Sequence, residues 1–110
     1  MGDRVSIQFA QIRGDYVWYS AVLKDHWGGS EFPQQALEFV RSINAETRVS
    51  TPLSRLEPSA VMVAFVQHLT SPESLRLNSL RLVPTKKDCD NSDNGHFIIW
   101  TDSLTIEKEG

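Results

Sequence analysis

The sequence has little of several things that would assign a function directly. It holds a single cysteine, Cys89, so it cannot close an internal disulfide, and we expect a reducing, cytoplasmic setting. No apolar run approaches the roughly 18 residues of a membrane span, and the amino terminus lacks the basic and apolar regions of a signal peptide. We therefore expect no membrane association.

The sequence also has no large excess of charge of either sign. Eleven basic residues stand against fourteen acidic ones, which leaves a net charge of −3. A protein that binds nucleic acid by neutralising phosphates needs a basic surface, so direct nucleic-acid binding is not expected. The 110 residues, 40% of them hydrophobic, are enough for one domain with a core of its own. We expect that domain to span residues 1–110, with 107–110 as a frayed tail.

Two β-strands are predicted at the start of the chain. In residues 5–12 apolar side chains alternate with polar ones, which is the period of a half-buried strand. After a turn at residues 13–15, residues 16–23 are rich in aromatic and β-branched side chains, and both faces of that strand are largely apolar. Such a strand is expected to be central in its sheet or covered on both sides. The two strands together predict a hairpin.

Two helices and two more strands are predicted after the hairpin. Apolar residues recur at helical spacing over residues 31–43. Pro58 begins a second predicted helix, although the β-branched content of the apolar run at 60–66 also suits a buried strand. Residues 75–82 and 96–106 are predicted strands. The predicted fold is α+β, a four-stranded antiparallel sheet with two helices in the order β-β-α-α-β-β.

The acidic segment 88–96, with the sequence DCDNSDNGH, holds the densest group of oxygen ligands. Counted from Asp90, side-chain oxygens fall at Asp90, Ser92 and Asn94, which is the opening pattern of a calcium loop. The twelfth position is Thr101, where a bidentate Glu belongs, so only a weak site for calcium or another divalent cation is expected. The alternative is a hairpin connection in which the Asn-Gly pair supplies positive φ angles and the side chains cap backbone N–H groups.

A second candidate site is the turn of Asp25, His26 and Trp27. A carboxylate, an imidazole and an aromatic plane stand there before two glycines and a predicted helix start. The exposed N–H groups of that helix start suit a small anion or a carbonyl group. The alternative is a structural strand-to-helix turn in which Trp27 packs on the sheet.

An up-and-down course of the predicted elements places the two candidate sites at opposite ends of the domain. A catalytic centre that combines His26 with Asp90 and His96 then has to span a strand length, about 15–20 Å. The same course brings three arginines beside the acidic segment, where they neutralise its aspartates: Arg13, Arg48 and Arg55.

Three phrases resemble a small, uncharacterised family of prokaryotic or viral single-domain proteins. They are GDRVSI at residues 2–7, HWGG at 26–29 and DNSDNGHF at 90–97. No activity is attached to that family. The resemblance gives the two loops added weight as sites and implies no catalytic role for any residue.

The sequence favours a small, non-catalytic module that binds a protein partner. A specific form of this hypothesis, by analogy with anti-CRISPR proteins, is an inhibitor of a host complex encoded by a phage or mobile element. The expected contact residues, facing basic groups of the partner, are Asp88, Asp90, Asp93 and His96. One alternative is a small metal-assisted or acid–base enzyme that uses the acidic segment or the turn at residues 25–27. Another is a homodimer joined through a sheet face or the second helix.

Overall fold

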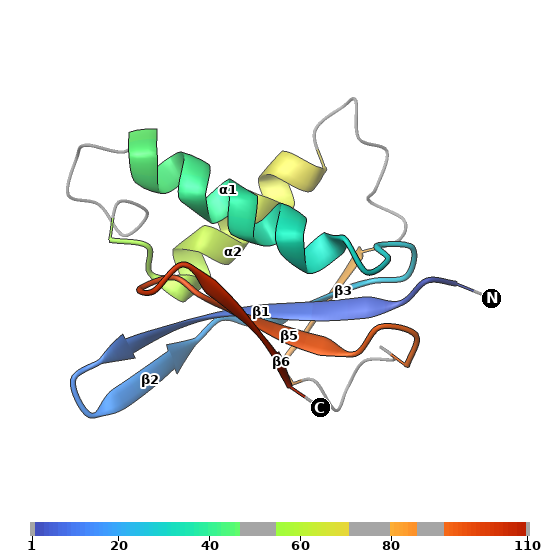
Figure 1. Cartoon of the computed structure of the whole chain (residues 1–110), viewed down its shortest axis with the longest axis horizontal. Coiled ribbons are helices and arrows are strands. Elements are labelled where there is room, and N and C mark those ends of the chain that lie inside the picture. The colour runs from blue at the N-terminus through green and yellow to red at the C-terminus, as the bar shows by residue number, and fades with distance from the viewer. Residues whose placement is uncertain (1, 47–54, 71–79, 86–91, 110) are drawn as a thin grey trace.

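The fold is one β-sheet with two helices on one of its faces (Figure 1). The computed structural model describes residues 2–46, 55–70, 80–85 and 92–109. In chain order these form β1 (Val5–Arg13), β2 (Tyr16–Tyr19), β3 (Val22–Asp25), α1 (Phe32–Glu46), α2 (Pro58–Leu69), β4 (Leu80–Val83), β5 (His96–Trp100) and β6 (Thr105–Glu109). The strand order is β4-β3-β1-β5-β6, and β2 pairs with the far half of β1.

The sheet is mixed, and this corrects the four-stranded antiparallel sheet that the sequence predicted. β1 and β5 run parallel, with Phe9 beside Ile99, whereas the other pairs of described strands are antiparallel. The described elements follow the order β-β-β-α-α-β-β-β, with six strands in place of four. The α+β class and the two helices are confirmed.

One extra strand arises because the predicted strand at residues 16–23 is divided by a β-bulge. β2 pairs with β1 as far as Tyr19, and β3 resumes the pairing at Leu23, so the three residues between them face only two of β1. The Ser20 hydroxyl supports the bulge, because it accepts a hydrogen bond from the Phe9 N–H at 3.0 Å. The extra residue reverses which side chains point toward the helices, so the apolar alternation changes phase at this point.

The second extra strand arises because the predicted strand at 96–106 folds back on itself as β5 and β6. The Leu104 N–H donates to the Trp100 carbonyl at 2.8 Å, and Leu104 takes a positive φ of 57° to close the turn. Residues 107–109, which the sequence predicts as part of a frayed tail, lie in β6 and pair with β5. The strand expected at 75–82 is seen as β4 from residue 80, and the residues before it lie outside the described part of the chain.

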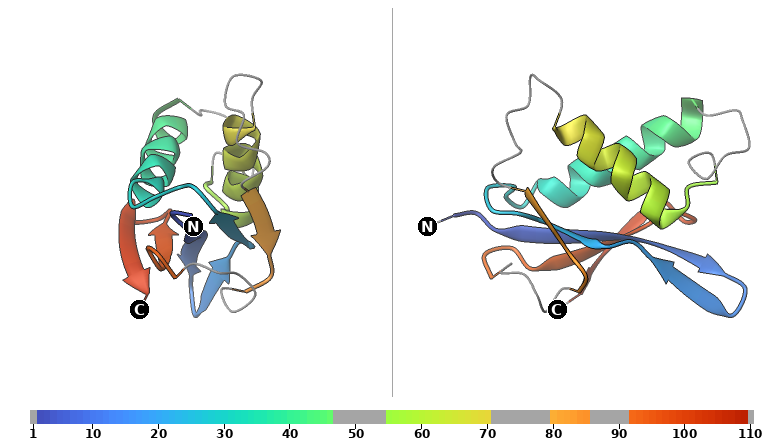
Figure 2. Two further views of the ribbon diagram at one scale, coloured as in Figure 1. Left: turned by 90° about the vertical axis from the view of Figure 1, so that its right-hand side faces the viewer. Right: turned by 180° about the vertical axis from the view of Figure 1, so that it is seen from behind.

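Both helices pack on the same face of the sheet, α1 over β5 and β6 and α2 over β1 (Figures 1 and 2). In α1 the buried residues Phe32, Ala36 and Val40 recur every four positions. In α2 the ring of Phe65 lies 5.8 Å from the rings of both Phe9 and Phe32, at the centre of the core. Neither described helix has the length and apolar composition that crossing a membrane requires.

The parallel pairing also corrects the predicted positions of the two candidate sites. Parallel strands start at the same end of a sheet, and β3, which is antiparallel to β1, finishes at that end. The turn after β3, which holds His26, and the turn before β5, which holds Asp93, therefore lie at one end of the sheet. The prediction that they lie at opposite ends was wrong, because it assumed antiparallel neighbours throughout.

Replacing Phe65 by alanine should lower the free energy of unfolding by about 3–5 kcal/mol, because the change leaves a cavity among three other phenylalanine rings. Urea denaturation followed by circular dichroism measures the loss. Val63→Ala is the matched control on the same helix, since Val63 is 69% exposed, and its effect should stay within about 0.5 kcal/mol. Equal losses in the two variants would contradict the assigned core.

Candidate functional site

The amino-terminal segment joins the two loops that the sequence singled out. The Asp3 N–H donates to the His26 carbonyl at 2.9 Å, and the Asp3 carbonyl accepts from the Gly29 N–H at 2.9 Å. On its other side, the Arg4 carbonyl accepts from the Asn94 N–H at 3.0 Å. The structure therefore brings together the turn at residues 25–27 and the described part of the acidic segment, residues 92–96.

The carboxylate of Asp93 is held by Arg4. Its Oδ2 accepts from the backbone N–H and from the Nε of Arg4, each at 2.8 Å. These hydrogen bonds, side chain first and backbone second, lower the pKa of Asp93 from its ordinary value of 3.8 to about 2, and the nearby His26 contributes in the same direction. The neutralising arginine is thus Arg4, because residues 4 and 93 meet through the parallel pairing of β1 and β5.

The side chain of Asn94 is also used inside the protein. Its Nδ2 donates to Asp3 Oδ1 at 2.7 Å and to the Arg4 carbonyl at 3.0 Å. Gly95 takes a φ of +91°, which favours glycine. The interpretation of this segment as a hairpin connection was wrong, because β4 and β5, which it joins, are not neighbours in the sheet. Its capping part is seen at Asp93, whose carboxylate accepts from the Arg4 N–H, and the positive φ belongs to Gly95 alone of the Asn-Gly pair.

The cation site stays a prediction. Asp88 and Asp90 lie outside the described residues. Within the part of the chain that is described, no group of three or more histidine, cysteine, aspartate or glutamate side chains is arranged to hold a metal ion.

His96 is 3% exposed and lies beside Ser6, on the face of the sheet that points away from the helices. Its Nδ1 is 2.7 Å from the Ser6 hydroxyl and its Nε2 is 3.3 Å from Gln8 Oε1, while the Gln8 amide donates to the Ser20 carbonyl at 2.9 Å. Because Gln8 donates to Ser20, its oxygen accepts from the Nε2–H, and Nδ1 accepts from Ser6. The result is a polar chain that crosses from β5 over β1 to the bulge.

A serine beside a histidine invites comparison with a nucleophile and its base. Ser6 is fully buried, so a substrate cannot reach its oxygen while this fold persists. The second nitrogen of His96 contacts an amide, whereas a Ser-His-Asp triad has an orienting carboxylate there. The hydrogen bond between Ser6 and His96 therefore stabilises the sheet. Burial also keeps the His96 ring from meeting a partner protein.

The turn at residues 25–27 is built around a buried carboxylate. Asp25 is fully buried, and its Oδ1 accepts from the Trp27 N–H at 3.0 Å, which closes an Asx-type turn. Trp27 is 63% exposed, so it does not pack on the sheet as the structural interpretation expected. The rings of His26 and Trp27 meet edge to face, with centroids 5.1 Å apart.

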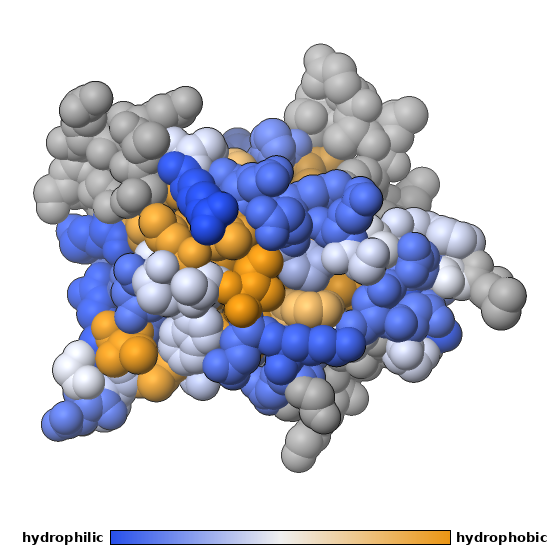
Figure 3. All heavy atoms as spheres, in the orientation of Figure 1, coloured by the Kyte–Doolittle hydropathy of each residue, from blue (hydrophilic) through white to orange (hydrophobic). Residues whose placement is uncertain are grey.

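A surface that the sequence did not identify as a site lies at the opposite end of the sheet. Here the β1–β2 hairpin projects past the helices (Figures 1 and 2), with orange apolar side chains over it in Figure 3. Five large residues of the hairpin are between 42% and 72% exposed, and we call them the hairpin patch: Ile12, Tyr16, Val17, Trp18 and Tyr19. The sequence feature that could have identified this surface is the apolar character of both faces of residues 16–23.

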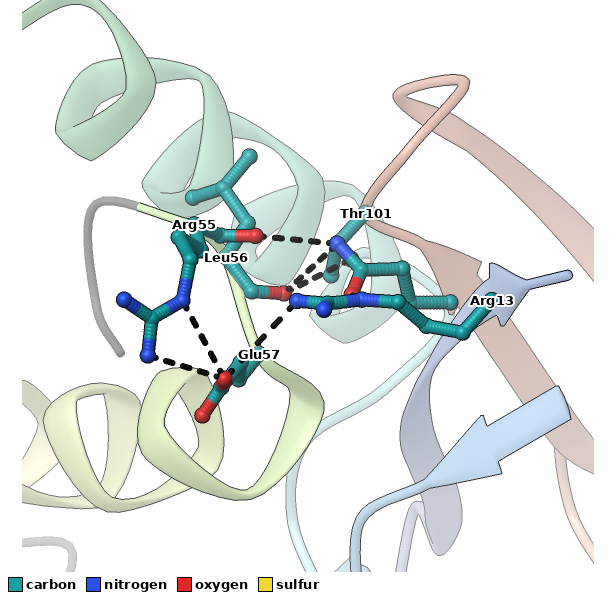
Figure 4. Close-up of polar contacts among 6 residues, drawn as sticks. Arg13, Arg55, Leu56, Glu57 and Thr101 are labelled. Carbon is teal, nitrogen blue, oxygen red and sulfur yellow. Dashed lines mark hydrogen bonds and ion pairs between the residues drawn. The ribbon is translucent and has the colours of Figure 1, made fainter. Parts of the chain in front are cut away.

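The base of the hairpin is anchored to the turn before α2 (Figure 4). The Gln11 amide donates to the Arg55 carbonyl at 2.9 Å, and the Thr101 hydroxyl donates to the Leu56 carbonyl at 2.9 Å. Glu57 then receives two guanidinium groups, that of Arg55 at 3.1 Å and that of Arg13 at 3.7 Å. Arg13 and Arg55, expected beside the acidic segment, thus lie at the other end of the sheet, and Arg48 lies outside the described residues.

The hairpin patch borders a shallow hollow. The guanidinium of Arg13 lies 4.8 Å from the centroid of the Trp18 ring, which holds that ring against the hairpin. Between β2 and the start of α2, a hollow of about 360 Å³ is lined by Trp18, Tyr19, Glu57, Pro58 and Ser59. The arrangement offers aromatic surface and a concavity on a fixed support.

Comparison with known proteins assigns no family. The chain matches no protein-family model, and no similar protein was found among curated proteins or among solved structures. The resemblance to small prokaryotic or viral proteins therefore stays a prediction.

Replacing Asp93 by asparagine should make stability less dependent on pH at the acid end. Because the folded pKa of Asp93 is below its unfolded value, the stabilisation from its charged form is present above pH 3.8 and is lost as the pH falls toward 2. Wild type should exceed the variant in stability near neutral pH, and the difference should shrink below pH 3.8 and vanish only once the pH is below about 2. Urea denaturation across this range measures it, and an NMR titration of the Asp93 carboxyl that gives a pKa near 4 would contradict the pairing with Arg4.

Proposed function

We propose that this chain is a non-catalytic protein-binding module whose recognition surface is the hairpin patch. The observation that carries the proposal is the exposure of five large apolar side chains on one projecting ribbon. Tyrosine and tryptophan are the residues that most often dominate binding energy at protein interfaces, because they bury a large area and lose little conformational entropy. Three of the five residues are of these two types.

The size of the patch fits recognition. Side chains of roughly 150–250 Å² each, about half exposed, present on the order of 500 Å². The largest apolar patch of a typical soluble protein is about 300–600 Å² and is often functional, and one side of a standard interface buries about 800 Å². The hairpin patch thus supplies more than half of one side of an ordinary interface.

The support of the patch favours tight binding. Arg13 bridges Trp18 and Glu57, and Gln11 joins the base of the hairpin to the turn before α2. A surface held in its bound shape loses less entropy on association than a flexible loop does. The cluster of Arg13, Arg55 and Glu57 is thus a positioning device for the aromatic residues.

This proposal moves the contact surface away from the acidic segment. Asp93 is already paired with Arg4, and His96 is buried, so two of the four expected contact residues have partners inside the protein. The other two, Asp88 and Asp90, lie outside the described residues. The more specific hypothesis of a phage-encoded inhibitor of a host complex gains no support from these contacts, and neither does a metal-assisted or acid–base enzyme.

A photo-crosslinking amino acid placed at position 18 should give a discrete protein adduct, whereas the same group at position 27 should not. Trp27 is the matched control, because it is an exposed tryptophan at the opposite end of the sheet. The experiment uses the full chain expressed in its native host, with adducts resolved by mass.

A second measurement tests how much the hairpin patch contributes to the binding affinity. The double variant Trp18→Ser, Tyr19→Ser should bind the crosslinked protein at least about 30-fold more weakly, as the loss of hot-spot residues does, with an unchanged circular dichroism spectrum. Adducts of equal yield at positions 18 and 27, or undiminished binding by the double variant, would remove the proposal.

A further inference from the structure

The described sheet has three outer edges, and they are not protected alike. β6 ends in Glu107, Lys108 and Glu109, and β4 carries Arg81 and is followed by Pro84. Charged side chains and proline are the devices by which proteins keep a strand edge from pairing with another chain. β2, of sequence YVWY, has none of them. Within the described part of the chain, β2 pairs with β1 alone.

The hydrogen-bonding groups on the outer edge of β2 follow from the turn. A two-residue turn at Gly14 and Asp15 makes the flanking residues a hydrogen-bonded pair, and such pairs alternate along a hairpin. The Ser20 N–H donates to the Phe9 carbonyl at 2.9 Å, as this alternation requires. Tyr16 and Trp18 therefore direct their backbone groups toward β1. Val17 and Tyr19 direct theirs outward.

The side chains of β2 suit a strand with neighbours on both edges. The register places Trp18 and Tyr16 on the side of the helices and Val17 and Tyr19 on the other side. All four are exposed, whereas an ordinary edge strand of a two-layer domain alternates between buried apolar and exposed polar residues. A strand of this composition is central in its sheet, and the single chain leaves it at an edge.

We propose that β2 pairs antiparallel with β2 of a second copy of this chain, across a two-fold axis at Trp18. The inference rests on the proposed function, since it names the partner of the same hairpin patch. The two Trp18 residues then lie opposite each other. On either side of them, Val17 of one copy lies opposite Tyr19 of the other. This register is the one in which all the outward backbone groups of Val17 and Tyr19 form hydrogen bonds between the copies.

A two-fold pair fits the other features of the surface. Each copy presents on the order of 500 Å², so the total is on the order of 1,000 Å², which is near the lower limit for a specific interface. The two Trp18 rings lie on the side of the helices, where the hollow beside α2 gives room for them. A two-fold contact occupies the β2 edges of both copies, so no β2 edge is left to bind a third copy. The protected edges of β4 and β6 keep the pair from growing into a fibre.

Disulfide trapping tests the register. In a Cys89→Ser background, Trp18→Cys alone should form a linked dimer under mild oxidation, since directly opposite residues of a non-hydrogen-bonded pair have Cα atoms about 4.5 Å apart. Val17→Cys or Tyr19→Cys alone should not link, because identical positions are then diagonal and beyond the roughly 7 Å limit. A mixture of those two variants should link, and it keeps Trp18 in both copies.

Trp27→Cys in the same background is the control for random collision, because residue 27 is exposed and far from β2. Linkage of Trp27→Cys at the rate of Trp18→Cys would overturn the proposal. So would linkage of Val17→Cys alone that is as fast as linkage of the mixture.

Sedimentation measures the pair without a covalent bond. Wild type should pass from monomer to dimer as its concentration rises from about 1 µM to about 1 mM. Val17→Pro should weaken the dimer at least about tenfold, because it removes an outward N–H and leaves the pairing with β1 intact. Val17→Lys, which adds an edge charge, should do the same if proline disturbs the hairpin. A wild type that stays monomeric throughout, or variants that dimerise as well as wild type, would overturn the second-copy inference.

The failures of the two proposals are distinguishable. A monomeric wild type whose position 18 still crosslinks another protein removes the second copy and keeps the hairpin patch as a protein-binding surface. A monomeric wild type with no adduct at position 18 removes both.

Discussion

The parallel pairing of β1 with β5 is the constraint on which the rest of this structure depends. β1 lies at the centre of the sheet and contacts β2, β3 and β5, and its own residues make contacts on both faces. One face meets the helices through Val5, Ile7 and Phe9, and on the other Ser6 holds the buried His96. Burial on both faces is the usual condition of a parallel pair. It explains why a polar serine, histidine and glutamine chain forms inside the sheet and not on a surface.

The same pairing decides what the residues richest in chemistry do. Because β1 and β5 start at one end, Arg4 meets Asp93, and the amino-terminal segment is held between the two loops that the sequence singled out. Asp93 and Asn94 are hydrogen-bonded to that segment, and Asp25 is hydrogen-bonded within its own turn, as connections between strands require of their backbone and capping side chains. Asp93 and Asn94 therefore stabilise the fold, and we propose that recognition falls to apolar residues at the opposite end, on the β1–β2 hairpin.

A single inserted residue separates that hairpin from the body of the sheet. The bulge around Ser20 ends the pairing of β2 and starts that of β3 with a reversed alternation. β4 continues the sheet beside β3 only, so the edge of β2 has no neighbour among the described strands. Two features then combine on four residues: an edge with unused hydrogen-bonding groups, and apolar side chains on both faces. The bulge thus produces, on β2, a surface that is suited to pairing with another chain.

The sequence by itself determined the α+β class, the first helix and the position of the first hairpin, because helical spacing, strand alternation and turn residues are local signals. It favoured the second helix and left a buried strand as the alternative there. It also predicted cover on both faces of residues 16–23, which the structure shows for Val22 and Leu23 and not for β2. Only the tertiary structure decided that β1 and β5 are parallel, that Arg4 and not Arg13 pairs with Asp93, and that His96 is buried. Those outcomes depend on residues about 90 positions apart, and no local pattern encodes which distant strand becomes the neighbour.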